Sequence, residues 1–394
     1  MRLYLIVIKG ENLDCKHFGT CGSCGLFDIS YEVQLKQKEE RVSGLLSPYY
    51  SEKLEIFDSP TSHYRARSEF RIWHDGDRCD YAMSKLPVDG IREKGAINIS
   101  ECPKVIEPIE KRMWSLLEKI NASPEVLKRK LFAVEFLATT TDECLITMLY
   151  HRKLDDEWST EAKALESELN CKIMGRSRKQ KVLLSDEFVT EKLDIDGKTV
   201  TYIQYESGFT QPNPVVNVKM IEWAIKQAKK VSNEKVGYGD FLESYCGLGN
   251  FTLPLSHYFD KVLATEISKG SIKAALENCA LNDIDNITFA RLSSEEMTEA
   301  LHGVREFNRL SDIDLMSYHF STVLVDPPRA GLDEGTIELI SKLENIIYIS
   351  CNPETLARDL ETLCQTHEVV EAAMYDQFPH TSHVESGVFL QLKA

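Results

Sequence analysis

Cysteine 351 has the sequence surroundings of a reactive thiol. It follows the short apolar run Ile346–Ile349, which predicts a buried strand. It precedes Asn352 and Pro353, which favour the N-cap and the first position of a helix. A thiol at the positive end of a helix dipole has a lowered pKa and ionises more readily near neutral pH. We therefore expect Cys351 to be a nucleophile, although a buried cysteine with a purely structural role is the commoner case.

A glycine-containing turn after another predicted strand has the pattern of a cofactor site. The strand Phe241–Tyr245 leads into Gly247 and Gly249, while Thr252 stands where a dinucleotide fingerprint has its third glycine. Glu266 ends the next predicted strand, where a carboxylate can hold two ribose hydroxyls. This combination resembles class I S-adenosylmethionine-dependent methyltransferases. A pyrophosphate cofactor would need more backbone donors at the start of the helix.

Strands and helices alternate through the C-terminal half of the chain, and this predicts a doubly wound, mainly parallel α/β sheet. Asp326 ends one of these strands, and the prolines that follow it favour an extended turn at the edge where such sheets bind ligands. A plain strand-terminating loop is the alternative. The predicted strands are Asp240–Tyr245, Val262–Glu266, Ile287–Arg291, Thr322–Asp326 and Ile346–Ser350, with Phe389–Leu392 as a late edge strand.

Three N-terminal cysteines have the spacing of metal ligands. Cys15, Cys21 and Cys24 follow the pattern C-x5-C-x2-C among glycines, and such grouping is typical of a metal site in a reduced protein. A site of four thiolates needs one more cysteine. Cys102 is the better candidate because a proline follows it, as in iron–sulfur ligand loops, and Cys79 is the competitor. Spacing alone leaves zinc and a [4Fe–4S] cluster both open.

Composition limits the class of protein. The chain has 394 residues, a length that is enough for two or three domains. Its hydrophobic fraction of 43% is ordinary for a globular protein. No apolar run approaches the roughly 20 residues of a membrane span, and the apolar start Met1–Ile8 lacks the cleavage pattern of a signal peptide. Eleven cysteines, mostly scattered singly, favour reduced thiols in the cytoplasm. Because the net charge is −16, a nucleic-acid partner requires a local basic patch.

Two upstream segments supply candidates for such a patch. The predicted strand Tyr64–His74 alternates, so that its arginines share one face, where they could contact phosphates while aromatic residues stack on bases. The run Lys172–Lys181 contains five basic residues and no acid. A solvated surface remains the alternative for both. The residues of interest in the strand are Arg65, Arg67 and Arg71, with the aromatic residues Phe70 and Trp73.

Taken together, several motifs closely resemble those of the RNA uracil-C5 methyltransferases. They are Gly208–Asn213, Tyr245–Asn250, Asp326–Leu332, Ser350–Pro353 and Phe378–Glu385. Two further stretches, Ser62–Gly76 and Tyr150–Trp158, look like the branch that makes 5-methyluridine at position 54 of tRNA. The N-terminal cysteine segment instead looks like the iron–sulfur motif of the 23S rRNA enzymes, which the bacterial tRNA enzyme lacks. The resemblance therefore favours the T-loop of tRNA as substrate, with 23S rRNA as the alternative.

The resemblance implies a covalent mechanism. Cys351 would add to C6 of the uracil, which makes C5 nucleophilic toward the methyl group of S-adenosylmethionine. Glu385 would then remove the C5 proton, with His380 and His383 as less favoured alternatives. The target uridine must be flipped out to reach the thiol. The residues expected to bind the cofactor are Gln211, Tyr245, Asn250, Glu266 and Asp326.

The resemblance also implies a [4Fe–4S] cluster held by Cys15, Cys21, Cys24 and Cys102. Its expected role is in folding or RNA docking, because methyl transfer needs no electron. The expected organisation is a cysteine-bearing segment with a helix at residues 1–58, an α+β RNA-binding domain at 59–207 and the methyltransferase domain at 208–394. Two rivals remain: a cluster-bearing RNA-binding protein without catalysis, and a 5-methylcytosine enzyme, whose nucleophile has a different motif.

Overall fold

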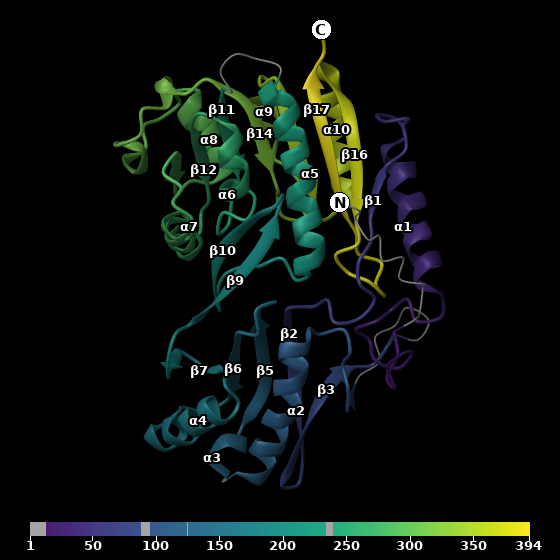
Figure 1. Ribbon diagram of the computed structural model, residues 1–394, viewed down its shortest axis with the longest axis vertical. Helices are drawn as coiled ribbons and strands as arrows, with labels where there is room; N and C mark the ends of the chain where they lie inside the picture. The colour runs from purple at the N-terminus through teal and green to yellow at the C-terminus, as the bar shows by residue number, and fades with distance from the viewer. Residues whose placement is uncertain (1–12, 88–94, 124, 234–238) are drawn as a thin grey trace.

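The computed structural model describes residues 13–87, 95–123, 125–233 and 239–394, and the apolar start Met1–Ile8 lies outside these ranges. Figure 1 shows two bodies, one above the other. The upper one is built on an eight-stranded sheet and the lower one on a seven-stranded sheet, and a two-stranded ribbon joins them. No helix in the described ranges is both long and apolar enough to cross a membrane.

The eight-stranded sheet has the order β1-β16-β17-β15-β14-β11-β12-β13. The five strands predicted from alternation are present and mutually parallel: β11 (Asp240–Ser244), β12 (Val262–Thr265), β13 (Ile287–Ala290), β14 (Phe320–Val325) and β15 (Asn345–Ser350). The sheet continues with β17 (Glu385–Leu392), β16 (His367–Tyr375) and β1 (Glu55–Phe57). The prediction of an edge strand at Phe389–Leu392 is wrong, because β17 lies inside the sheet, antiparallel to both β15 and β16.

Helices cover both faces of this sheet, which explains why its strands are apolar along their length. One face packs on α5 (Pro214–Asn233), α6 (Thr252–Leu255) and α7 (Lys269–Leu281). The other packs on α1 (Tyr31–Leu46), α8 (Ser294–Leu301), α9 (Glu334–Ile340) and α10 (Pro353–Thr366). In β15, Ile347 and Ile349 face the first layer, while Ile346 and Tyr348 face the second. The predicted doubly wound, mainly parallel α/β sheet is thereby confirmed.

The seven-stranded sheet has helices on one face only, and part of its other face is buried against Val189 of the two-stranded ribbon. Its order is β4 (Ala96–Asn98), β3 (Arg78–Ser84), β2 (Arg67–Asp75), β5 (Leu131–Ala138), β6 (Cys144–Tyr150), β7 (Lys172–Ser177) and β8 (Gln180–Leu183). Helices α2 (Glu107–Ala122), α3 (Glu125–Lys128) and α4 (Asp156–Glu168) bury one face. In β2, Phe70 and Ile72 point into this core, while Glu69, Arg71 and Trp73 are exposed on the opposite face.

Segments outside the predicted methyltransferase domain are tied into its sheet. Strand β1 extends the sheet by pairing in parallel with β16, and α1 packs beside α10. The ribbon β9 (Phe188–Ile195) and β10 (Lys198–Tyr205) packs on α5, and the Ile203 amide donates to Asn278 of α7 at 2.6 Å. The expected unit 1–58 therefore contributes a strand and a helix to the upper body.

Candidate active site

Three strand ends bring the predicted chemical residues to one edge of the eight-stranded sheet. Asp326 follows β14, and Cys351 follows β15. In the antiparallel pair β15–β17, Ser350 lies opposite Ser386. Continuing that register by one residue places Cys351 opposite Glu385, and directly opposed residues point to the same face of a sheet. The thiol and the two carboxyl groups are close enough for their charges to interact.

The environment of Cys351 does not favour its thiolate in the free protein. Burial raises the pKa of the Cys351 thiol to about 11, and the charges of Glu385 and Asp326 add to this shift, while Arg329 opposes it. The expectation of a lowered thiol pKa is therefore wrong for this state. The helix dipole of α10 is outweighed because the same fold that places the thiol there also buries it beside two acids.

The two carboxyl groups are themselves shifted upward. Burial raises the pKa of Glu385 to about 8, with Asp326 adding to the shift and Arg329 opposing it. Burial alone raises the pKa of Asp326 to about 7. The protonation of the Cys351 thiol and of the two carboxyl groups is therefore coupled. A carboxyl group with a pKa near neutrality suits a general base.

Arg329, to which sequence reasoning gave no role, is the cation of this cluster. Its Nη2 donates to His383 Nδ1 at 2.5 Å, and burial together with Arg329 lowers the pKa of His383. Asn352 stands at the N-cap position of α10 as predicted, but its side chain does not cap the helix. It donates instead to the Arg329 carbonyl at 3.1 Å. The only local signal for Arg329 is a basic residue directly after the two prolines.

A buried carboxylate holds the loop that carries Asp326 and Arg329 against α10. Asp359 Oδ2 accepts from the Leu332 amide at 2.9 Å and from the Tyr348 hydroxyl at 2.6 Å. Gly331 has φ +77° there, and a Cβ atom on it would lie 2.7 Å from Asp359 Oδ2. A side chain at position 331 would therefore be both strained and obstructed.

The predicted cofactor residues line two adjoining cavities. Gln211, Tyr245, Asn250 and Asp326 line one of them, and Tyr245 and Glu266 line the other, whose volume is about 400 Å³. Tyr245 belongs to both. The second cavity is further lined by hydroxyl and apolar groups, among them Ile267, Ser293, Ser294 and Leu332. The donor set, with a strand-end acid and an exposed apolar side chain nearby, fits a nucleoside cofactor.

The turn after β11 has the backbone that its glycines predict. Gly247 and Gly249 have φ values of +57° and +88°, and a Cβ atom on Gly249 would lie 2.3 Å from Leu253 Cδ1. Tyr245 also has a positive φ, +65°. Glu266 closes the turn by accepting from the Gly247 amide at 3.1 Å and the Ser268 amide at 2.7 Å. The carboxylate of Glu266 is thus oriented by backbone donors before a cofactor arrives.

The structure separates the predicted basic residues by role. Arg67 is occupied at the junction of the two bodies, where it donates to Glu135 at 2.6 Å and to the Glu206 carbonyl at 2.6 Å. Arg65 lies 5.9 Å from the centre of the Phe378 ring. Phe70 is 1% exposed inside the core, so its predicted stacking on a base is wrong. The remaining candidates on this strand are Arg71, which is exposed, and Trp73, which is 53% exposed.

The basic run Lys172–Lys181 forms the hairpin of β7 and β8, and much of its charge is neutralised. Lys172 pairs with Glu143 and Asp186, and Arg176 pairs with Glu206. Lys181 pairs with Glu187 and Glu206. Arg178 and Lys179 form no ion pair within the described part of the chain. The acids that compensate the run come from outside it, which is why the run itself looked uncompensated.

An open groove lies on the helix-free face of the seven-stranded sheet, and sequence reasoning did not find it. Its volume is about 760 Å³. Phe132, 37% exposed, stacks on His151 with ring centres 3.9 Å apart and planes 12° from parallel. A bulge in β5 between Leu131 and Ala133 interrupts the register at Phe132. The lining of the groove combines this aromatic pair with acidic and basic side chains: Glu69, Glu135, Arg152, Lys153, Arg176 and Arg178.

The four cysteines named as metal ligands line one small cavity. Cys15, Cys21, Cys24 and Cys102 all face it, whereas Cys79 is buried in the core with its sulfur 3.3 Å from His74 Nδ1. Burial raises the pKa of Cys102 to about 12, and the other three thiols add to the shift. A set of four thiols suits a soft metal. However, no group of three or more potential ligands in the described residues is arranged to hold a metal ion.

Comparisons with known proteins agree on one family. The model of the family described as tRNA (Uracil-5-)-methyltransferase matches residues 30–393. The "tRNA/tmRNA (uracil-C(5))-methyltransferase" of a Sulfurovum species is 77% identical over 379 residues, covering 96% of this chain and all of the relative. A protein of the same name from a Nitratiruptor species is 51% identical, covering 96% of this chain and 99% of the relative.

Among solved structures, the fold is similar to that of Pyrococcus abyssi tRNA (uracil-54, C5)-methyltransferase in complex with S-adenosyl-L-homocysteine. The TM-score is 0.68 at 24% identity, and the match covers 93% of this chain and 85% of that chain. At this identity the likeness concerns the arrangement of helices and strands.

Proposed function

Because the chain belongs to the tRNA (uracil-5-)-methyltransferase family, we propose that it transfers a methyl group from S-adenosylmethionine to C5 of a uridine in tRNA. The observation that carries this proposal is the convergence of Cys351, Glu385 and Asp326 where β14 and β15 end and the antiparallel β17 begins. Nucleophile and base must reach adjacent carbons of one pyrimidine ring. The β15–β17 register, which continues to Cys351 opposite Glu385, supports this assignment.

Cys351 is the proposed nucleophile, and its sulfur adds to C6 of the uracil. Addition turns C5 into an enolate-like carbon that is able to attack an electrophile. Because the thiol is mostly protonated in the free protein, its ionisation must accompany substrate binding. Arg329 is the neighbour that lowers the pKa of the thiol, and it is proposed to stabilise the thiolate.

Glu385 is the proposed general base. S-adenosylmethionine supplies the methyl group as a sulfonium electrophile. After transfer, C5 carries both the methyl group and a proton, and the carboxylate of Glu385 takes that proton. The electrons of the C5–H bond then restore the C5–C6 double bond, and the C6–sulfur bond breaks. The Cys351 thiolate leaves and the product base is released.

Gln211, Tyr245, Asn250 and Glu266 are proposed to hold S-adenosylmethionine, with Asp326 between the cofactor and the target base. Support comes from their positions around the two adjoining cavities. Glu266 is oriented by two backbone amides, as a carboxylate that binds ribose hydroxyls needs to be. Isothermal calorimetry with S-adenosylhomocysteine should register at least a tenfold loss of affinity for Glu266→Ala, in keeping with the loss of a charged hydrogen-bond acceptor.

The central domain, residues 59–207, is the proposed RNA-binding part. Its open groove supports this, because the Phe132–His151 stack offers a platform for a base and Arg178 offers an unpaired cation within the described ranges. Arg71 and Trp73 continue the same exposed sheet face. U54 in the T-loop is the favoured target, since Ser62–Gly76 and Tyr150–Trp158, which resemble the branch that methylates this position, contribute Glu69 and residues 150–153 to the groove.

The assignment of substrate is tested by nucleoside mass spectrometry of a strain that lacks the gene. We expect 5-methyluridine to disappear from tRNA, and to return when the wild-type chain is supplied but not when Cys351→Ala is supplied. Loss of the nucleoside from 23S rRNA with tRNA unchanged would replace the substrate by the alternative. Loss of 5-methylcytidine would replace the reaction.

The four-cysteine cavity is the proposed site of a [4Fe–4S] cluster, and its support is the shared lining by Cys15, Cys21, Cys24 and Cys102. The thiols repel one another as thiolates, so a cation among them would relieve the repulsion. Protein purified without oxygen should be brown and contain about four iron and four sulfide per chain. Colourless protein with one zinc would contradict the cluster, and Cys79→Ala should leave the metal content unchanged.

A further inference from the structure

Helix α1 buries a polar face. Gln34, Lys38 and Arg41 are spaced by four and three residues, so they lie on one side of the helix. Gln34 is fully buried and Lys38 is 3% exposed. Buried amide and ammonium groups are costly unless each finds a partner, so a helix face of this kind is specific for what it touches.

What this face contacts is the segment that leads into the proposed base. Lys38 Nζ donates to Asp376 Oδ1 at 2.6 Å and to the Phe378 carbonyl at 3.1 Å. The His380 amide donates to Gln34 Oε1 at 2.9 Å. Arg41 Nη1 donates to the Ser382 carbonyl at 3.0 Å. The helix thus holds alternate residues 376, 378, 380 and 382, and Glu385 begins the strand three residues later.

The other side of residues 376–383 faces the RNA-binding body and the catalytic loop. Tyr64 of the central domain donates its hydroxyl to the Pro379 carbonyl at 3.1 Å. His380 Nε2 donates to the Thr61 carbonyl at 2.8 Å, which leaves Nδ1 to accept from Gln34 Nε2 at 3.4 Å. Arg329 binds His383. The segment therefore lies where α1, the central domain and the Asp326 loop meet.

A role in stability alone would not require a buried ion pair between α1 and residues 376–383. A buried ion pair such as Lys38–Asp376, with exposures of 3% and 0%, contributes little net stability compared with an apolar pair of the same size. Its directional contacts do fix geometry. The pair holds the segment in one conformation at the place where the position of a carboxylate matters most.

We propose that Lys38 and Gln34 are positioning residues for the proton-removal step, because α1 holds residues 376–383 in the conformation that presents Glu385 to C5 of the target base. This inference rests on the proposed function. It assigns to the N-terminal helix a part in the chemistry, although α1 carries no residue of the cluster around Cys351.

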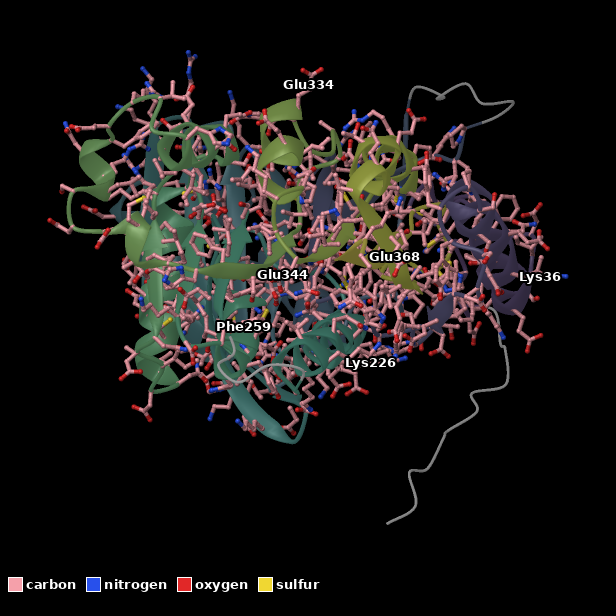
Figure 2. The ribbon with its side chains drawn as sticks, turned by 90° about the horizontal axis from the view of Figure 1, so that it is seen from above. Lys36, Lys226, Phe259, Glu334, Glu344 and Glu368 are labelled. Carbon is pink, nitrogen blue, oxygen red and sulfur yellow. The ribbon has the colours of Figure 1, made fainter. Side chains whose placement is uncertain are left out.

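The chain offers a matched control on the same helix. Lys36 is 73% exposed and lies 3.8 Å from Glu40, its partner on the surface. Figure 2 shows its side chain directed away from the body of the protein. Lys36→Met therefore removes the same charge from the same helix without touching residues 376–383.

The experiment compares wild type, Lys36→Met, Lys38→Met and the double variant Lys38→Met/Asp376→Asn, which leaves no unpaired buried charge. Each is measured for turnover on a tRNA T-arm hairpin, for the fraction of enzyme in the denaturation-resistant RNA adduct, and for affinity toward S-adenosylhomocysteine. The double variant should lose turnover by roughly ten- to a hundredfold, as expected for a displaced catalytic group, while the adduct accumulates and cofactor affinity stays within about twofold. Lys36→Met should behave as wild type.

Two outcomes would overturn the inference: wild-type turnover in the double variant, or a loss of turnover matched by an equal loss of adduct formation and cofactor affinity, which indicates general unfolding. Hydrogen–deuterium exchange adds a readout independent of activity. Exchange should rise in residues 376–384 of both Lys38 variants and stay unchanged in β11 to β15. If the wild-type enzyme makes no 5-methyluridine, the proposed function fails. Faster exchange of residues 376–384 in the Lys38 variants would even then show that α1 holds this segment, and unchanged exchange would contradict that contact.

Discussion

The two large sheets of this protein use their polar residues differently. The eight-stranded sheet is covered on both faces, so its polar groups gather at one edge, where the half-buried Cys351 and Asp326 lie beside the buried Glu385 and all three have raised pKa values. The seven-stranded sheet carries helices on one face only, and on its other face Arg71, Trp73 and Phe132 lie on a surface open to water.

This contrast separates chemistry from binding. Burial changes the acidity of a group but restricts what can reach it, whereas an open face can receive a large ligand. Substitutions at the buried edge should therefore change rates, and substitutions on the open face should change affinity. The following predictions test that division, beginning with the largest effect.

Cys351→Ala should abolish methylation and the covalent adduct with 5-fluorouridine-containing RNA, because no other group in the cluster can add to C6. Gel electrophoresis under denaturing conditions measures the adduct. RNA affinity should change less than about twofold, since the thiol is not on the open face. Cys364→Ala changes a half-buried cysteine in α10, the helix that follows Cys351; it is the control and should stay active. An adduct in the Cys351 variant would move the nucleophile elsewhere.

Glu385→Gln should slow turnover by roughly a hundredfold to ten-thousandfold, the range of a general base, while the enzyme–RNA adduct accumulates. Addition and methyl transfer survive in this variant, but the C5 proton has no acceptor. Single-turnover kinetics separates adduct formation from release. Normal release would remove Glu385 from the role of base and turn attention to His383, which is held by Arg329.

The pH dependence should follow the raised pKa of Glu385, which burial and Asp326 bring to about 8. Only the ionised carboxylate accepts a proton, so adduct release should slow about tenfold for each unit below pH 8. The raised pKa of Glu385 also makes the free energy of unfolding depend on pH. Between the ordinary pKa and about 8 the folded state binds the extra proton, so stability falls as pH rises through that window. Urea unfolding of Glu385→Gln should show a flatter pH dependence than wild type.

Phe132→Ala should weaken binding of tRNA by roughly tenfold, because stacking on an aromatic ring contributes about 1–3 kcal/mol per base. Turnover at saturating tRNA should be unchanged. Leu183→Ala is a matched control, since Leu183 is 46% exposed on β8 but does not line the groove. Fluorescence anisotropy with a labelled T-arm measures the affinity. Equal affinities for the two variants would remove the groove from RNA binding.

Arg71→Gln should have the smallest effect, about threefold in affinity at moderate salt. Its clearer signature is the salt dependence, whose slope should become shallower by roughly 0.7 to 0.9 if one phosphate contact is lost. Arg78→Gln, at the tip of the β2–β3 hairpin and 72% exposed, serves as the control. If turnover rather than affinity falls in the Arg71 variant, the division between edge and face is wrong.

Much of the fold followed from local pattern. The five parallel strands were predicted within a few residues of their observed bounds, because apolar runs followed by turns and helices are a local signal. Strand β1 and the internal position of β17 were missed, since strand order depends on pairing between distant segments. Phe70 was misassigned to the exposed face because it neighbours three arginines in sequence, although alternation places it in the core.

The candidate site likewise combines features that the local sequence predicts with features that depend on the tertiary structure. The sequence by itself determined that Cys351 and Asp326 stand at strand ends, and that Gly247 and Gly249 form a turn, because each depends only on a few neighbouring residues. Only the tertiary structure decided that Glu385 lies across from Cys351, that the thiol pKa is raised rather than lowered, and that Lys38 reaches Asp376. Each of these depends on burial and on partners from distant strands and helices, which no local pattern encodes.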